Sequence, residues 1–444
     1  APIATAKSGP AMAPVAAKTY AALEALGGDV IVCDTGGTTF DVGLVHADEI
    51  VFTRDTWIGG QYTGHLIANS TVDIRSLGAG GGSIAWVDAG GLLNVGPQSA
   101  GSEPGPACYG RGGTQPTVTD AAAVLGYLNP EKFLGGRMAL DIDAARQAVA
   151  SVGDSLNKNT EETAWAILKI ADELMIKAIH EITVVEGFNP QDAAIIAGGG
   201  AAGLNIMPIA AELGVSRVVL PKMAGALSAV GMQYADIVGE ESGTALTTSQ
   251  QFNYQGVNRL LDNMRARLEH YVSELDIDKP AEINWSTYVE ARYLGQVWEI
   301  TVPVPVSRFV NNEDVAQLVT AFHTAHERIY AVTDPDSHVE CLSWKMRVAI
   351  TLADTSVAME TTTPLTAAPP KHQRHCNFGH AQSVLTPVYS GDDLKPGMTL
   401  QGPAIIEEPT TTLVVYPTMA VSVTGAGNYR LQLSADETIQ STKG

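Results

Sequence analysis

The chain has 444 residues, of which 45% are hydrophobic and only 17% are charged, and its formal net charge is -21. A chain of this length and apolar content can bury two or three cores, which argues against a disordered scaffold. A surface this negative repels phosphate backbones and anionic lipids, so we expect neither nucleic acid nor a membrane surface as a partner.

The cysteines and the N-terminal residues bear on the compartment. Cys33, Cys108, Cys341 and Cys376 stand far apart and form no C-x-x-C pair. This spacing argues against a disulfide scaffold or an iron–sulfur site and is typical of a reducing cytosol. The first residues lack a basic start followed by an apolar core, and no apolar stretch approaches the length of a membrane span. We therefore expect a soluble, cytoplasmic protein.

The first pattern that carries chemistry is a glycine-rich hairpin between two apolar strands, DVIVCDTGGTTFDVGLV (29–45). Its tight turn consists of Gly36, Gly37, Thr38 and Thr39. Backbone N–H groups in such a turn can point at an anion with no side chain in the way. Asp34, at the end of the first strand, is placed to hold the water shell of a Mg²⁺ ion that bridges two phosphates. An ordinary hairpin is the alternative, but the full D-x-G-G-T-x-x-D-V pattern favours phosphate binding.

The segment that follows is rich in glycine, serine and threonine and contains GAGGGS (78–83). This glycine run can approach a phosphate or substrate through Gly80, Gly81 and Ser83, or it can form a tight turn between strands. Arg75, just before it, can bind an anionic group or pair with an acidic neighbour. Both alternatives stay open from the sequence.

Helical patterns follow this segment. Asp120, in PTVTD, can be a catalytic carboxylate, but an N-cap for the helix AAAVLGYL is favoured. From Asp141 the pattern is helical, and residues 160–188 give the clearest helix of the chain. Apolar residues recur there at three- and four-residue spacing, which predicts one buried face.

A second glycine turn lies in DAAIIAGGGAAGLNIMPIAAELGVSRVVL (192–220), which predicts strand, turn, helix and strand. The turn consists of Gly198, Gly199 and Gly200. It lets a ribose and adenine lie directly on the backbone at a helix N-terminus. A Rossmann turn is the weaker alternative, because its spacing and its acidic residue are missing, and no P-loop pattern occurs. We assign adenosine binding to this turn and to Asn205.

The chain changes in style after residue 239. An amphipathic helix over 257–275 precedes strand-like segments, and the Pro- and Thr-rich run 355–373 is predicted to be a surface linker. The tail, 403–425, alternates like half-buried strands. We predict an α/β nucleotide-binding domain over 1–240 and an α+β or β-rich domain over 241–444.

Two histidine groups are possible metal sites. His323 and His326 can share one face of a helix, but no third ligand stands near them, so packing is favoured. A second group, in KHQRHCNFGH, consists of His372, His375, Cys376 and His380. Because it follows the predicted linker, a polar loop is favoured over a metal site.

Four segments together resemble the hydantoinase A/5-oxoprolinase/acetone carboxylase family. They are residues 72–128, 198–237, 322–330 (FHTAHERIY) and 394–415. The resemblance covers essentially the whole chain, and its first block is specific to the family. One departure is Ala331, which stands where the family usually has glycine.

The resemblance implies a ribonuclease H-like lobe of the actin/hexokinase/Hsp70 superfamily, dependent on ATP and Mg²⁺. The implied enzyme is an ATP-dependent cyclic amide hydrolase that phosphorylates the amide oxygen of a hydantoin or 5-oxoproline. The implied catalytic residues are Asp34 and Asp120. One alternative is a subunit of an acetone- or acetophenone-type ketone carboxylase. Another is a non-catalytic actin-like ATP-binding module.

The resemblance also implies partners. A hydantoinase B-like subunit usually accompanies this family. Complete members have an earlier Gly-Gly-Thr loop, and none precedes Asp34 here. We therefore read the Asp34 hairpin as the second phosphate loop and expect another chain or segment to supply the first lobe. The chain alone is then expected to be inactive.

Overall fold

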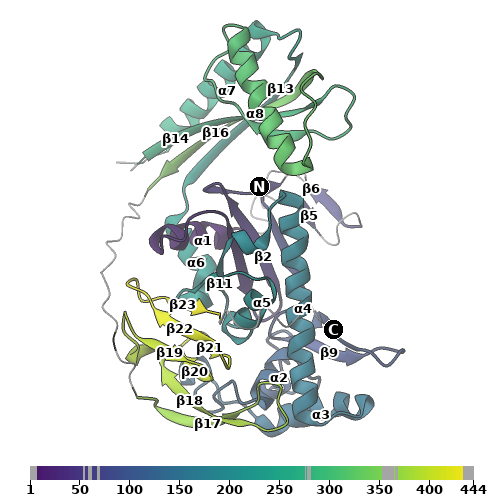
Figure 1. The fold of residues 1–444 in the computed structure, drawn as a ribbon, viewed down its shortest axis with the longest axis vertical. Coiled ribbons are helices and arrows are strands. Elements are labelled where there is room, and N and C mark those ends of the chain that lie inside the picture. Colours follow the sequence, from purple (N-terminus) through teal and green to yellow (C-terminus); the bar gives the residue numbers. More distant parts are fainter. Residues whose placement is uncertain are drawn as a thin grey trace. The chain divides into compact units, whose positions relative to one another are not determined.

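A computed structural model describes residues 8–53, 56–58, 63–67, 71–275, 277, 282–352, 365 and 369–433. The chain divides into two compact units (Figure 1). The first consists of 1–184, 188–233 and 356–444, and the second of 185–187 and 234–355. The chain thus enters the second unit near the predicted boundary at 240. The division differs from the predicted segments because the C-terminal strands return to the sheet of the first unit.

The first unit is built on a central sheet that places both predicted glycine turns. Its inner strands are β1 (Val30–Thr35), β2 (Phe40–His46), β11 (Ala194–Gly198) and β12 (Arg217–Leu220). β1, β11 and β12 are parallel, and β2 is antiparallel to β1. Because Asp34 pairs with Gly198 in the register of β1 and β11, the hairpin and the glycine turn leave the sheet at the same edge.

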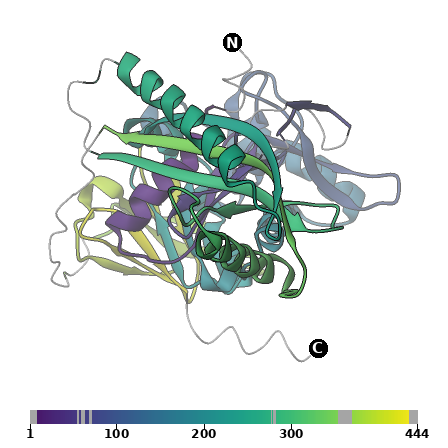
Figure 2. The ribbon, with the colours of Figure 1, turned by 90° about the horizontal axis from the view of Figure 1, so that it is seen from above.

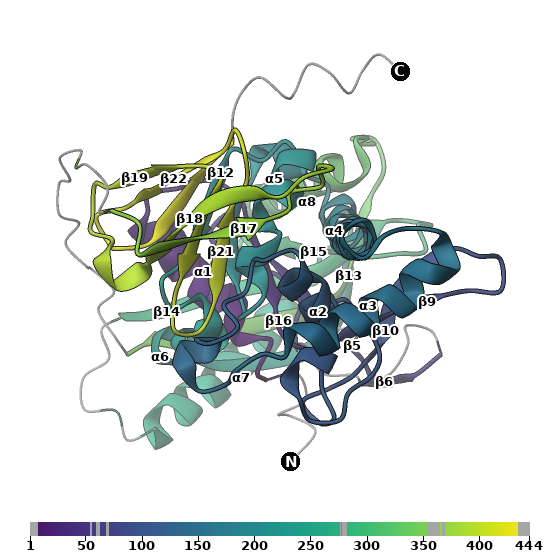
Figure 3. The same cartoon turned by 90° about the horizontal axis from the view of Figure 1, so that it is seen from below.

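C-terminal strands extend this sheet beyond β12. They are β19 (Thr399–Gln401), β22 (Ala420–Val423) and β23 (Tyr429–Gln432), and the order is β19-β22-β23-β12-β11-β1-β2-β3. Figure 3 shows β19 and β22 on the same side of the first unit as β12. At the other side, β2 pairs with both β3 (Glu49–Ile50) and β8 (Ile74–Leu77). Parallel strands flanked by helices confirm the α/β class predicted for this part of the chain.

Apolar residues on both sides of β1 explain why helices cover both faces of the sheet. Successive side chains of a strand point to opposite faces, and Val30 and Val32 pack with α1 (Met12–Leu23) while Ile31 and Cys33 face the other core. That second core contains the buried face of α4 (Thr160–Glu186). The predicted helix over 160–188 is therefore confirmed.

The remaining elements of the first unit surround this sheet. The helices are η2 (Ala107–Tyr109), α2 (Val118–Val124), η3 (Leu134–Gly136), α3 (Ile142–Leu156), η4 (Pro190–Asp192), η5 (Ala202–Leu204), α5 (Ile206–Glu212), η6 (Ala224–Ala226), α6 (Leu227–Tyr234) and η7 (Gly391–Asp393). The strands are β4 (Phe52–Thr53), β5 (Thr56–Ile58), β6 (His65–Ile67), β7 (Thr71–Val72), β9 (Ser83–Val87), β10 (Leu93–Ser99), β17 (His372–Cys376), β18 (Val384–Ser390), β20 (Ala404–Glu407) and β21 (Thr412–Val415).

The second unit is an antiparallel sheet with two helices (Figure 2). The strands β13 (Ile237–Thr248), β14 (Glu282–Tyr293), β15 (Ile300–Pro303) and β16 (Val339–Thr351) lie in the order β13-β16-β14-β15. The helices are α7 (Tyr254–Glu274) and α8 (Asn312–Tyr330). Alternate residues of β14 and β16, such as Val289 and Trp344, share one core with both helices. Most of the predicted linker at 355–373 lies outside the described residues.

Helix α8 ends at a strained residue. Ala331 adopts φ 56° and ψ 25°, a left-handed conformation that favours glycine, and its N–H donates to the Glu327 carbonyl. This conformation costs an L-residue roughly 1–2 kcal/mol. Glycine avoids that strain, but it lowers the free energy of unfolding by about 0.4–1 kcal/mol because it raises the conformational entropy of the unfolded chain. We expect Ala331→Gly to raise the free energy of unfolding by about 1 kcal/mol in urea. Ala325→Gly, inside the same helix, is expected to lower it by about 1 kcal/mol. If both variants lose the same free energy of unfolding, Ala331 is not strained.

Candidate functional site: two glycine turns at one cavity

The hairpin turn after β1 presents free backbone amides. Gly36 N–H donates to the Thr39 carbonyl at 2.9 Å, which closes the predicted turn. The carbonyls of Gly36 and Gly37 accept from Gly81 N and Gly82 N at 3.0 and 2.5 Å. In a trans peptide the N–H points opposite to the C=O, so the N–H groups of Gly37 and Thr38 point away from the glycine run at 78–83. Within the described part of the chain, the amides of residues 37–39 have no backbone acceptor, and of these three residues Gly37 lines the cavity described below. The turn therefore fits an anion.

The glycine run 78–83 is both a turn between β8 and β9 and a support for this hairpin. A Cβ at Gly80 would lie 2.8 Å from Thr38 N and from Gly36 O, so only glycine fits. Ser83 is buried, and its Oγ accepts from Gly80 N at 2.8 Å and donates to Gly78 O at 3.2 Å. Arg75 pairs with Val42 of β2 in the sheet register, and it does not line the cavity described below.

The second glycine turn touches the first. Gly199 has φ +93°, and a Cβ there would lie 2.1 Å from the Thr35 carbonyl oxygen and 2.7 Å from Asp34 Oδ1. The next residue but one, Ala201, donates its N–H to the same Thr35 oxygen at 3.0 Å. The two glycine turns are therefore in direct backbone contact.

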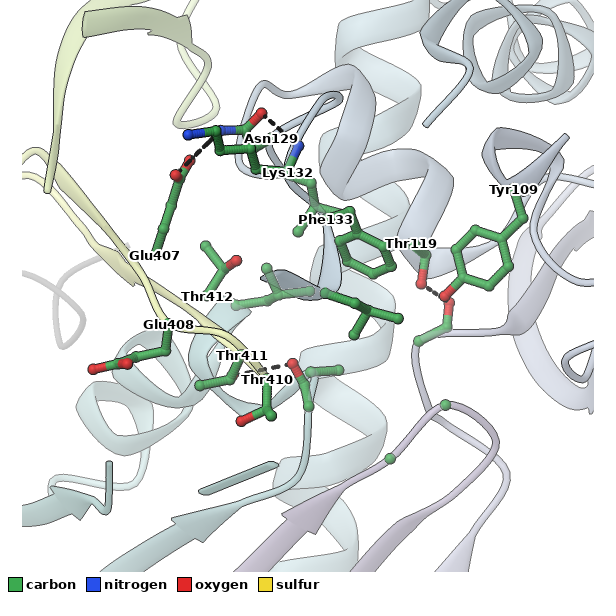
Figure 4. A pocket seen from close by; sticks show the side chains of 18 residues that line it. Tyr109, Thr119, Asn129, Lys132, Phe133, Glu407, Glu408, Thr410, Thr411 and Thr412 are labelled. Carbon is green, nitrogen blue, oxygen red and sulfur yellow. Dashed lines mark hydrogen bonds between the residues drawn. The ribbon is translucent and has the colours of Figure 1, made fainter. Parts of the chain in front are cut away.

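A cavity opens where the turns meet (Figure 4). Its lining from the two turns and the glycine run consists of Gly36, Gly37, Gly81, Gly200 and Ala201. On the same side Leu204 of η5 also lines the cavity, and an opposite wall consists of Tyr109, Thr119, Leu128, Asn129, Lys132, Phe133 and Leu134. A third part, from the C-terminal region, consists of Glu407, Glu408, Thr410, Thr411 and Thr412. Figure 4 shows Phe133 and Tyr109 on one side and the three threonines on the other. The apolar part of the opposite wall, formed by Leu128, Phe133 and Leu134, faces glycine backbone, and this arrangement suits a flat ring with a polar tail.

Asp34 lies beside the cavity rather than in its lining. Its Oδ2 accepts a hydrogen bond from Ser228 Oγ at 3.0 Å. Burial raises the pKa of the Asp34 carboxyl, the Ser228 bond lowers it, and the nearby Asp41 charge raises it further. Asp41 itself has a buried Oδ1 without a hydrogen-bond partner in the described chain. Two close, incompletely compensated carboxylates fit a cation.

The same carboxylates do not form a closed metal site. Among the described residues, no group of three or more His, Cys, Asp or Glu side chains could hold a metal ion. A Mg²⁺ ion here would thus depend on water and phosphate oxygens for most of its ligands, which is how this ion is usually held. The residues fit Mg²⁺ together with a phosphate better than Mg²⁺ alone.

Asp120 is placed as a structural carboxylate. It is the third residue of α2, and Thr117 is the N-cap, so the predicted cap lies three residues earlier. Both Asp120 oxygens are occupied, by the N–H groups of Ala107, Cys108 and Thr117 and the Thr117 hydroxyl, and the residue is fully buried. The structure therefore corrects the catalytic assignment, because no substrate can reach this carboxylate.

Asn205 also points into the core rather than into the cavity. Its Nδ2 lies 3.4 Å from the Met175 sulfur, and its side chain is near Asp172 of α4. The helix η5 separates Asn205 from the glycine turn, and Asn205 stands at the N-cap of α5 without a side-chain cap hydrogen bond. The residues that do face the cavity on this side are Gly200, Ala201 and Leu204.

Asp172 makes the stability of the first unit depend on pH. Burial raises the pKa of Asp172 to about 7, although Lys169 at 3.7 Å and Asn205 favour the ionised form. The unfolded value is about 3.9, so the folded chain holds the proton more tightly. The contribution of Asp172 to the free energy of unfolding is then expected to fall as the pH rises from about 4 to about 7, by on the order of 3 kcal/mol.

Asp172→Asn is expected to remove this contribution and to raise the free energy of unfolding at pH 8 by on the order of 3 kcal/mol. At pH 4 the variant and the wild type are expected to unfold at similar urea concentrations. Glu173→Gln, at the exposed neighbouring position, is the matched control. A slope that survives in Asp172→Asn, measured by urea unfolding between pH 4 and pH 8, contradicts the assignment.

The histidine groups are engaged in packing and sheet pairing. His323 Nδ1 bonds the Tyr293 hydroxyl at 2.7 Å, and His326 is bonded through both ring nitrogens, to Gln296 and to the Val332 carbonyl. The favoured packing reading is confirmed for this pair. The predicted polar loop at His372 is wrong, because residues 372–376 form β17 and pair with β18. Cys376 is buried in that strand.

Two family models match the chain. Residues 1–241 match the model of the hydantoinase/oxoprolinase family, and residues 248–431 match the model of the hydantoinase/oxoprolinase C-terminal domain. The chain belongs to the hydantoinase/oxoprolinase family. The resemblance seen in the four sequence segments is therefore confirmed.

Several members of the hydantoinase/oxoprolinase family are similar over nearly the whole chain. Caprolactamase subunit alpha of Pseudomonas jessenii is 36% identical over 431 residues, which are 96% of this chain and 61% of that protein. Acetophenone carboxylase gamma subunit of Aromatoleum aromaticum is 31% identical over 411 residues, 89% of this chain and 55% of that protein. A 5-oxoprolinase of Dictyostelium discoideum is 27% identical and covers 89% of this chain and 31% of its own length.

Solved structures show the same fold. The crystal structure of the ATP-dependent caprolactamase from Pseudomonas jessenii superimposes with a TM-score of 0.82 at 33% identity, over 94% of this chain and 61% of that chain. A nucleotide-free acetone carboxylase superimposes with a TM-score of 0.74 at 23% identity, over 96% of this chain and 61% of that chain. The chain thus spans about 61% of the length of each of these solved relatives. No helix in the described ranges is long and apolar enough to cross a membrane.

Proposed function

We propose that this chain is the ATP-binding part of an enzyme that uses ATP to open a cyclic amide. The observation that carries the proposal is the contact of two glycine turns at one cavity, beside the half-buried carboxylate of Asp34. The likeness to an ATP-dependent caprolactamase supports a lactam, hydantoin or 5-oxoproline as the class of substrate. The fold we propose is the ribonuclease H-like lobe of the actin/hexokinase/Hsp70 superfamily.

The two ends of the cavity suit the two ends of a nucleotide. The free amides of residues 37–39 would bind phosphate oxygens, because consecutive N–H groups form an anion nest. The nucleoside would lie between Gly200 and the apolar wall that includes Phe133. Asp34 would hold Mg²⁺ through water. When bound, ATP supplies the phosphoryl group that turns an amide oxygen into a leaving group.

The chain's own residues act by position and charge. Asp34, whose pKa is raised by burial, is held at a fixed place by the Ser228 hydroxyl, so it need not reorganise when charge develops nearby. The glycine run at 78–83 fixes the hairpin through two backbone bonds, so the amides keep one orientation. Both features lower the cost of ordering the reacting groups.

Partners complete the proposed enzyme. Relatives named as an alpha and a gamma subunit support assembly with other chains. We propose a hydantoinase B-like subunit as one partner and a lobe with the first phosphate loop, from another chain or segment, as the other half of the nucleotide cleft.

A ketone carboxylase is the second candidate. It is favoured by the 31% identity to the acetophenone carboxylase gamma subunit. The same nucleotide site would serve it, since only the acceptor of the phosphoryl group changes.

Copurification followed by turnover measurement tests the proposal. The intact protein is isolated under native conditions with its bound chains, and ADP release is measured with a lactam or hydantoin, or with a ketone and bicarbonate. We expect ADP release that depends on the cyclic amide and not on bicarbonate. Stimulation only by ketone plus bicarbonate would favour the carboxylase. ADP release independent of every acceptor would favour a non-catalytic ATP-binding module.

A further inference from the structure

The turn between β20 and β21 belongs to the cavity wall although it lies about 200 residues after the glycine turn. Glu407 pairs with Thr412 across this hairpin, and Glu408 N–H donates to the Thr411 carbonyl at 3.0 Å. The turn is therefore a closed, four-residue unit. Figure 4 shows its threonines beside the cavity.

This turn packs directly on the backbone around the glycine turn. Thr411 is buried, and its Oγ1 donates to the Gly200 carbonyl at 3.1 Å. A Cβ at Gly203 would lie 2.2 Å from the Thr412 carbonyl oxygen, and a Cβ at Gly225 would lie 2.5 Å from Thr410 Cβ. Thr410, Thr411 and Thr412 therefore all contact the backbone around the glycine turn, the first two through their side chains and the third through its carbonyl oxygen.

The other end of the turn is fixed as well. Glu408 is buried, and its Oε1 accepts a hydrogen bond from the Tyr429 hydroxyl and lies 3.9 Å from Lys222 Nζ. Gly391 leaves room for this carboxylate, because a Cβ there would lie 2.6 Å from Oε2. Since both ends are anchored, the Thr411 hydroxyl has a fixed position.

One peptide unit links this turn to both glycine turns. The carbonyl of Gly200 accepts from Thr411, and the N–H of the same peptide, on Ala201, donates to the Thr35 oxygen of the phosphate hairpin. Resonance keeps the peptide planar, so holding its oxygen also fixes the direction of its N–H.

We propose that Thr411 is a positioning residue that sets the spacing of the two glycine turns through the Gly200–Ala201 peptide. This inference rests on the proposed function, because it assigns the spacing to the binding of ATP. Thr411 acts through the peptide and does not need to touch the nucleotide. The C-terminal family domain thereby contributes to the nucleotide site of the first family domain.

The test compares three variants of the intact protein, with its bound chains. Thr411→Val keeps the shape and loses the hydroxyl, and Thr411→Ser keeps the hydroxyl. Thr386→Val is the matched control, because Thr386 is also buried and its Oγ1 donates to a backbone carbonyl, that of Val384, at 3.0 Å. Dissociation constants for ATP and ADP are measured by calorimetry, and unfolding by urea at the same temperature.

We expect both valine variants to unfold at lower urea concentrations, since each loses one buried hydrogen bond. Only Thr411→Val is expected to weaken ATP and ADP binding, by about five- to tenfold, and Thr411→Ser is expected to restore it. Wild-type affinity in Thr411→Val, or equal losses of affinity in Thr386→Val, overturns the positioning role. A wild-type protein that binds no ATP overturns the proposed function, and this inference with it.

Discussion

Replacing Asp34 with asparagine is expected to lower ATP turnover by the assembled enzyme at least about 100-fold. The substitution keeps the shape and the partner Ser228 Oγ at 3.0 Å but removes the charge that would hold Mg²⁺. Burial already raises the pKa of this carboxyl, so its ionised form costs free energy in the folded protein. We therefore expect the free energy of unfolding at pH 8 to stay the same or to rise.

Ser228→Ala is the control for Asp34→Asn. It removes the hydrogen bond to Oδ2 but keeps the carboxylate, so turnover is expected to fall less than tenfold. ADP release and urea unfolding are measured on the same preparations. Unchanged nucleotide affinity and turnover in Asp34→Asn would refute the role of Asp34.

Gly199→Ala is expected to separate the two glycine turns. A Cβ at this residue would lie 2.1 Å from the Thr35 carbonyl oxygen, and φ of +93° is unfavourable for alanine. Neither the clash with backbone nor the strain can be relieved by a side-chain rotation. We expect a loss of about 3 kcal/mol or more in the free energy of unfolding and a loss of ATP binding.

Gly27→Ala separates strain from contact. Gly27 also has positive φ, +61°, but a Cβ there meets no atom within 4 Å. We expect it to lose about 1 kcal/mol in urea unfolding and to bind ATP like the wild type. If Gly199→Ala behaves like Gly27→Ala in both measurements, the contact between the turns does not matter for the site.

Local patterns were sufficient for the parts of the site made by neighbouring residues. The hairpin after Asp34 and the turn at Gly198 each consist of an apolar strand followed by glycines, so both were predictable from a short window. Their meeting followed from the parallel pairing of β1 and β11, which places both turns at one edge of the sheet.

Contacts between distant segments were not predictable in this way. Phe133 and Thr411 line the cavity, yet neither stands in a pattern that carries chemistry, and Thr411 reaches Gly200 only because C-terminal strands return to the first sheet. The catalytic role predicted for Asp120 is wrong for the same reason. Two of its four hydrogen-bond donors are the N–H groups of residues 107 and 108, which a local sequence pattern does not connect with Asp120.

A structure of the intact protein with ADP or a non-hydrolysable ATP analogue tests the central claim most directly. We predict phosphates against the amides of residues 37–39 and the nucleoside between Gly200 and Phe133. A nucleotide bound elsewhere, with both glycine turns free of it, would contradict this account.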